Sequence, residues 1–92
     1  MEKVYIAGKI TGDDNYKNKF RMCQEELEAN GKIVINPAIL PIGMSNADYM
    51  RICFAMIDSA DKIYFLPDFR NSEGAMLELQ YAVYIDKDII IL

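Results

Sequence analysis

The sequence contains no histidine and no tryptophan, and only two of its 92 residues are cysteines. The lack of histidine removes the most common general base and the most common zinc ligand from any functional hypothesis. Cys23 and Cys53 are far apart in the chain and fall within predicted helices, which favours reduced, buried thiols over a disulfide or a metal site. The sequence therefore predicts a cytoplasmic protein that needs no metal and no cofactor.

Basic tracts and long apolar runs are also missing. The net charge is -4 at pH 7, and without a basic tract we do not expect binding along a nucleic-acid backbone. No apolar run approaches the roughly 20 residues that span a bilayer, and the N-terminus lacks the layout of a signal peptide. We therefore expect neither nucleic acid nor a membrane as a partner. A small anionic ligand can still bind a local nest of backbone amides.

Apolar residues make up 52% of the chain, which predicts a single domain over residues 1–92. Short, continuously apolar runs alternate with helical patterns along it. Strands are predicted at Lys3–Ala7, Lys32–Ile35, Lys62–Leu66 and Asp88–Leu92, and helices at about Tyr16–Ala29, Asp48–Ser59 and Glu73–Ile85. This alternation predicts an α/β fold of the flavodoxin or Rossmann type. Its three-layer, doubly wound sheet would hold four mainly parallel strands in the order 2-1-3-4.

In such a fold a ligand binds beyond the carboxyl ends of the strands, where the strand order reverses. Three segments should converge there: the loop after the first strand, the loop Asn36–Asn46, and Asp68–Glu78 after the third strand. Gly8 and Gly12 would let backbone amides approach a phosphate closely, although glycines at such turns are also structural. Ser72 offers similar chemistry at the start of the third helix, or simply caps it.

Glu78 is the residue that the predicted core does not explain. Its neighbours three and four residues away on the helix are Gly74, Ala75, Tyr81 and Ala82, a small and apolar set that should face the sheet. A carboxylate in that position is paired with a cation, has a raised pKa, or performs chemistry. Tyr5, near the end of the first strand, can donate a hydrogen bond to it or can be an ordinary core residue.

The motifs YIAGKITG, AD-x-I-x-x-LPD and S-x-G-A-x-x-E-x-x-x-A together resemble those of the nucleoside 2-deoxyribosyltransferase superfamily, in particular its small, phage-type branch. The resemblance runs from Val4 to Leu92. It implies that Glu78 is a nucleophile that attacks the anomeric carbon of a deoxyribose, and that Tyr5 orients it. In the transferases, the resemblance implies an aspartate six residues before the nucleophile. The residue at this position here is Ser72, and a serine there resembles the sequences of the 2'-deoxynucleoside 5'-monophosphate N-glycosidases.

The resemblance implies a small nucleoside or nucleotide as the partner. The residues that would bind it are Gly8, Lys9, Ile10, Gly12, Asp68, Ser72 and Gly74. The family's acid on the second helix falls on Cys53. Asp48, Asp58 or Asp68 would replace that acid, or the chain has no general acid.

Three hypotheses about function stay open at this point. The first is an enzyme that hydrolyses the N-glycosidic bond of a deoxynucleoside 5'-monophosphate or, as the less favoured course, transfers its deoxyribosyl group. The second is a module that binds a nucleotide in the same pocket without chemistry, and the third is a structural protein whose pocket is a relic. Apolar, tyrosine-rich helices would leave much apolar surface exposed, so we also predict a homodimer or a larger homo-oligomer.

Overall fold

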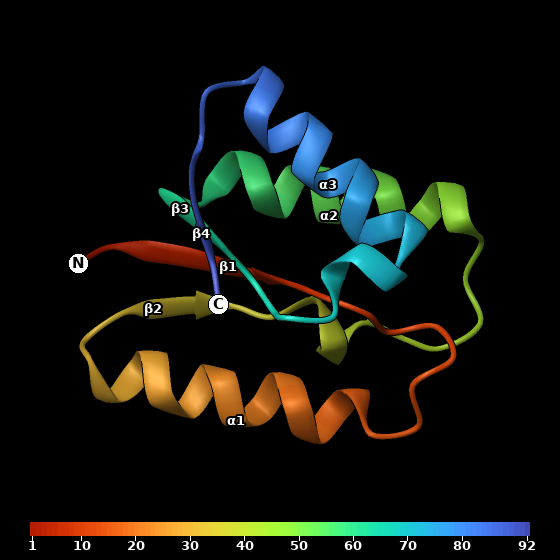
Figure 1. Cartoon of the computed structure of the whole chain (residues 1–92), viewed down its shortest axis with the longest axis horizontal. Coiled ribbons are helices and arrows are strands. Elements are labelled where there is room, and N and C mark those ends of the chain that lie inside the picture. Colours follow the sequence, from red (N-terminus) through yellow and green to blue (C-terminus); the bar gives the residue numbers. More distant parts are fainter.

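A computed structural model describes residues 1–92 and shows a four-stranded parallel sheet with helices on both faces (Figure 1). The strands are β1 (Lys3–Ala7), β2 (Ile33–Ile35), β3 (Lys62–Phe65) and β4 (Asp88–Ile91). The helices are α1 (Tyr16–Ala29), α2 (Asn46–Ser59) and α3 (Glu73–Tyr84), with short 3-10 turns η1 (Pro37–Ile39) and η2 (Phe69–Asn71). The strand order is β2-β1-β3-β4 and every pair is parallel, so the predicted α/β fold is confirmed.

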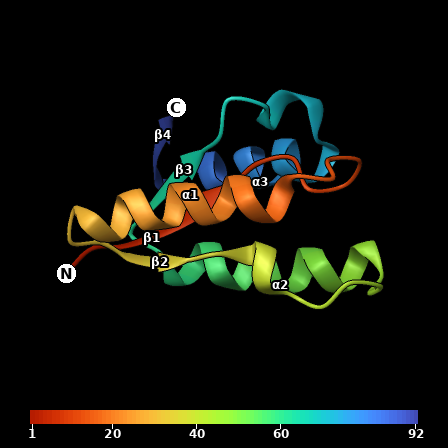
Figure 2. The same ribbon diagram turned by 90° about the horizontal axis from the view of Figure 1, so that it is seen from below.

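Helix α1 covers one face of the sheet, and α2 and α3 cover the other (Figures 1 and 2). Side chains alternate along β1 accordingly, because successive residues of a strand point to opposite faces. Tyr5 and Ala7 belong to the core cluster under α2 and α3, whereas Val4 and Ile6 belong to the cluster under α1. Both faces of β1 are therefore buried, which explains why these four consecutive residues are all apolar or aromatic.

Local caps set where α2 and α3 begin. The hydroxyl oxygen of Ser45 accepts the amide of Asp48 at 3.1 Å, and that of Ser72 accepts the amide of Ala75 at 3.1 Å. Because Ser45 is the cap, α2 begins at Asn46, two residues before the predicted start. No helix in the chain combines the length and the apolar character that crossing a bilayer requires.

The long loop between β2 and α2 is tied to the helices at both of its ends. Asn36 is buried, and its side chain accepts the amide of Ala38 at 2.8 Å and donates to Gln24 on α1 at 2.9 Å. Near the other end, the Tyr49 hydroxyl donates to the Pro41 carbonyl at 2.5 Å. The loop is thus fixed against both α1 and α2.

Gly8 follows β1 at a point where the chain passes very close to the end of β3. A Cβ atom at this position would lie 2.8 Å from Cδ1 and 3.0 Å from Cβ of Leu66. Leu66 is itself buried, so it has little room to move away. The glycine is thus required by packing, whatever its role toward a ligand.

We expect Gly8→Ala to lower the free energy of unfolding by about 1–3 kcal/mol, because the added methyl group overpacks the contact with Leu66. Urea denaturation measures this loss. The control is Gly31→Ala, where φ is +82° and no atom lies within 4 Å of the added Cβ, so that only backbone strain is tested. Wild-type stability of Gly8→Ala would show that the close approach does not require glycine.

Candidate active site

Glu78 on α3 faces the sheet, and only 5% of its surface is exposed. Tyr5, fully buried on the central strand β1, donates a hydrogen bond from its hydroxyl to Oε2 of Glu78. None of the ion pairs of the chain includes Glu78, so pairing with a cation of the same chain does not explain its burial. The structure thus brings together the two residues that the sequence predicted as catalytic.

Burial is the main reason why the pKa of Glu78 rises from 4.5 to about 7, and hydrogen bonding with Tyr5 and with the thiol of Cys53 only partly opposes it. Burial likewise raises the pKa of the Cys53 thiol to about 11. Burial first, and then the neighbouring Glu78, hold the pKa of Tyr5 well above its usual value. At neutral pH, two protonated donors therefore surround a carboxyl group that is close to its own midpoint.

No second carboxyl group lies beside Glu78. Cys53 stands at the position where the resemblance to the deoxyribosyltransferases implies an acid, and it is buried with Tyr5 in the same core cluster. Of the three proposed substitutes, Asp48 pairs with Arg51, Asp58 accepts the Tyr81 hydroxyl, and Asp68 pairs with Lys19. Nor is there any group of three or more acidic or thiol side chains placed to hold a metal ion.

The loop after β1 and the segment after β3 do meet, through bonds that the sequence did not predict. Asp68 accepts the backbone amide of Lys9 at 3.1 Å and also pairs with the ammonium group of Lys19 on α1. Lys9 and Asp68, both predicted to bind the ligand, are therefore bonded to each other. The amides of Ile10 and Gly12, in contrast, make no hydrogen bond within the chain.

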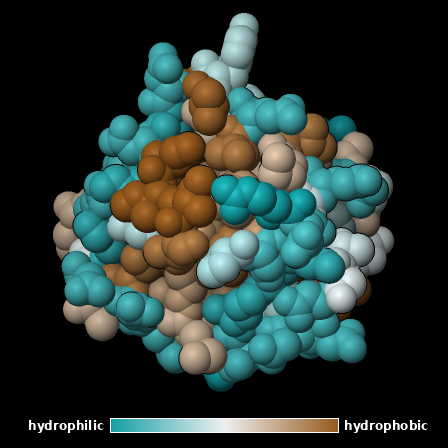
Figure 3. Space-filling view, in the orientation of Figure 1, coloured by the Kyte–Doolittle hydropathy of each residue, from teal (hydrophilic) through white to brown (hydrophobic).

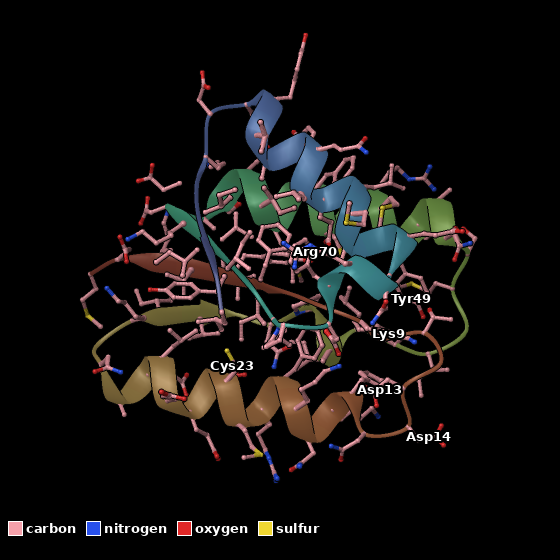
Figure 4. The ribbon with its side chains drawn as sticks, in the orientation of Figure 1. Lys9, Asp13, Asp14, Cys23, Tyr49 and Arg70 are labelled. Atoms are coloured by element: carbon pink, nitrogen blue, oxygen red, sulfur yellow. The ribbon has the colours of Figure 1, made fainter.

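Sequence reasoning missed Lys19 because a single lysine on an amphipathic helix looks like a solvated residue. Its place directly before the buried Phe20 gives no sign of a partner, since its partners lie on two loops. Figure 4 shows Lys9 and Asp13 on the loop after β1, at the same end of the molecule as Tyr49 of α2, with Cys23 further along α1.

Cys23 is only half-buried, so the prediction of two buried thiols is right for Cys53 alone.

The start of α3 is more crowded than the sequence suggested. Ser72 is the helix cap, and its hydroxyl group can still donate a hydrogen bond. A Cβ on Gly74 would lie 3.4 Å from the terminal methyl of Met50, so this α2 side chain packs over α3 one turn before Glu78. A surface hollow of about 500 Å³ includes Ser72, but neither Glu78 nor Tyr5 lines it. The carboxyl group therefore lies under a cover of side chains.

Comparison with known proteins agrees with the predicted fold. A sequence model described as a domain of unknown function, DUF4406, matches residues 2–91. No curated protein matches the sequence. A 2-desoxiribosyltransferase from Leishmania mexicana superposes with a TM-score of 0.80 at 18% identity, over 100% of this chain and 64% of that chain. The CMP N-glycosidase of Clostridium botulinum superposes with a TM-score of 0.67 at 22% identity, over 98% of this chain and 70% of that chain.

These likenesses concern the fold, since both identities are low. They confirm that the chain has the architecture expected from its resemblance to the nucleoside 2-deoxyribosyltransferase superfamily. The chain spans less than two thirds of the length of the Leishmania structure, so it matches only part of that protein.

The raised pKa of Glu78 gives a test that needs no substrate. The contribution of Glu78 to the free energy of unfolding is fully present below about pH 4.5, where the carboxyl group is protonated in both states. It is lost as the pH rises through about 7, because the folded state must then bury a charge that the unfolded state exposes to water. We expect Glu78→Gln to be more stable than the wild type by roughly 3 kcal/mol at pH 8, and about equally stable at pH 4. Urea denaturation at both pH values measures the difference.

The control for this experiment is Glu25→Gln, which neutralises an exposed glutamate on α1. It should change stability little at either pH. If Glu78→Gln and the wild type kept the same difference in stability from pH 4 to pH 8, Glu78 would have an ordinary pKa and the account of its burial would be wrong.

Proposed function

The chain belongs to the DUF4406 family, and from its buried glutamate–tyrosine pair we propose that it cleaves the N-glycosidic bond of a deoxynucleoside 5'-monophosphate. In this proposal the ionised carboxylate of Glu78 attacks the anomeric carbon, the C–N bond breaks, and the base leaves with the electron pair. Water then hydrolyses the glycosyl ester, which releases deoxyribose 5-phosphate and restores Glu78. Transfer of the sugar to a second base is the less favoured course.

The hydrogen bond from Tyr5 to Glu78 is the observation that carries this proposal. It holds Oε2 of the carboxyl group in a fixed position. Because the pKa of Tyr5 is raised by burial, the phenol keeps its proton and donates throughout the neutral range. A nucleophile held by fixed donors in a dry environment needs little reorganisation when it reacts.

The 5'-phosphate would bind where backbone amides lack partners. Those of Ile10 and Gly12 are unpaired, and the Ser72 hydroxyl and the first turn of α3 face the same end of the sheet. The Lys9 side chain forms no ion pair and would add a positive charge. Gly74 would leave room for the sugar once the side chain of Met50 moves aside. The name of one similar structure, a 2-desoxiribosyltransferase, supports a deoxyribosyl group, and that of the other, a CMP N-glycosidase, supports a nucleoside monophosphate.

A nucleotide-binding module without chemistry is the alternative. Two observations favour it: Cys53 stands where the resemblance to the deoxyribosyltransferases implies an acid, and only 5% of Glu78 is exposed. Without a second carboxyl group, no residue is assigned to protonate the departing base. The same phosphate-binding residues would then serve recognition alone.

Incubation with each deoxynucleoside 5'-monophosphate should release free base, detected by chromatography. The rate should rise with pH through about 7, because Glu78 must be ionised to attack. We expect Glu78→Gln to lower the rate on the order of 10³-fold or more, and Tyr5→Phe by roughly 10²-fold. Glu25→Gln is the control and should keep the wild-type rate. Nucleotides that raise the melting temperature without any release of base would instead establish the binding module.

We also propose that the chain associates with itself, as its exposed apolar surface suggests. Figure 3 shows this surface gathered over β4 and beside α3. Leu77 and Val83 on α3 are 48% and 55% exposed, and Ile91 on β4 is 48% exposed. Strand β4 is an edge strand without lysine or proline, the kind of edge that proteins usually cover.

Light scattering should therefore give a mass of at least two chains. We expect Ile91→Lys to shift the protein toward the monomer, because the charge would lie in the apolar contact. Ile42→Lys is the control, since Ile42 is 78% exposed in the loop before α2, away from β4. A wild-type monomer at high protein concentration would contradict self-association.

A further inference from the structure

The ammonium group of Lys19 uses all three of its N–H donors. It donates to the carbonyl oxygen of Lys9 at 2.9 Å, to Oδ2 of Asp13 at 2.5 Å, and to Oδ2 of Asp68. The remaining carboxylate oxygen of Asp68 accepts the amide of Lys9 at 3.1 Å. One lysine on α1 thus joins two loops that follow two different strands.

This cluster is sheltered from solvent. The side chains of Lys19, Asp13 and Asp68 are 23%, 24% and 28% exposed. Burial alone would lower the pKa of Lys19, but its hydrogen bonds to Asp13 and Asp68 outweigh this and raise it. Ion pairs in such a position are screened less than those on an open surface, so the cluster can hold a loop in place.

The pinned residues lie on either side of the unpaired amides. Lys9 is fixed through both its amide and its carbonyl group, and Asp13 is fixed through its carboxylate. The amides of Ile10, Thr11 and Gly12 lie between these two fixed points and make no hydrogen bond within the chain. The ion-pair cluster therefore fixes both ends of a stretch of this loop whose backbone donors make no hydrogen bond within the chain.

We propose that Lys19 is a positioning residue that shapes the Ile10–Gly12 amides to receive the 5'-phosphate of the substrate. This inference rests on the proposed function for the identity of the ligand. Lys19 does not bind the phosphate itself, because two carboxylates and a carbonyl group already occupy its donors. Because Lys19 already holds the loop in place before the ligand binds, binding costs less conformational entropy.

The test compares two ligands that differ only in the phosphate: a deoxynucleoside 5'-monophosphate and its deoxynucleoside. Calorimetric titration gives the Kd of each. We expect Lys19→Met to raise the Kd of the monophosphate at least about tenfold and to leave that of the deoxynucleoside unchanged. Where turnover is measurable, KM for the monophosphate should rise and kcat should stay close to the wild-type value.

Lys17→Met is the matched control, since Lys17 is an exposed lysine of the same helix whose side chain makes no hydrogen bond or ion pair. It should leave both Kd values unchanged. Asp13→Asn is a milder variant that removes one charge from the cluster. It serves as the test if Lys19→Met does not fold. It should give a smaller, still phosphate-specific, loss of affinity.

An unchanged Kd of the monophosphate in both variants would overturn the proposal, as would an equal loss of affinity for both ligands, which indicates a structural role alone. A wild-type protein that binds the monophosphate no more tightly than the deoxynucleoside would also overturn it. Phosphate-dependent binding without release of base would refute the proposed catalysis and leave the role of Lys19 intact.

Discussion

The main constraint on this structure is that a small core must accommodate a buried carboxyl group. A buried carboxylate is costly unless it is hydrogen-bonded, and Tyr5 on the central strand supplies the bond to Glu78. Small residues make room for it: Ala75 and Ala82 on α3 are fully buried against the sheet and bring the helix close. The position of the glutamate thus follows from a rigid strand on one side and from small side chains on the other.

Much of this arrangement can be predicted from the sequence, because the signals are local. Continuously apolar runs marked the four strands, and Ser72 marked the start of α3. The helical period placed Glu78 among small residues and therefore toward the sheet. That Tyr5 would be its partner was implied by the resemblance to the deoxyribosyltransferases, because a continuously apolar strand does not show which of its side chains face which helix.

The rest could not be predicted, because it depends on side chains that meet across loops. Asp68 and Lys19 are 49 residues apart in sequence, and no pattern on α1 distinguishes this lysine from a solvated one. The cover that Met50 forms over Gly74 is likewise a packing outcome of two helices. Ser72 shows the same difference. Its role as a helix cap can be predicted from the sequence, whereas its ability to bind a ligand depends on the side chains that surround it.

The parallel order of the strands has a consequence for how the chain reaches its native state. The central strand β1 comes first in the sequence, yet it pairs with β3, and the amide of Lys3 bonds to Asp61, 58 residues later. Tyr5 and Glu78 are 73 residues apart. A nascent chain leaving the ribosome must therefore hold its first strand half-paired until β3 has emerged, and Tyr5 without its partner until α3 has emerged. Contacts over such long sequence separations slow folding. The glutamate–tyrosine pair is accordingly among the last features to assemble.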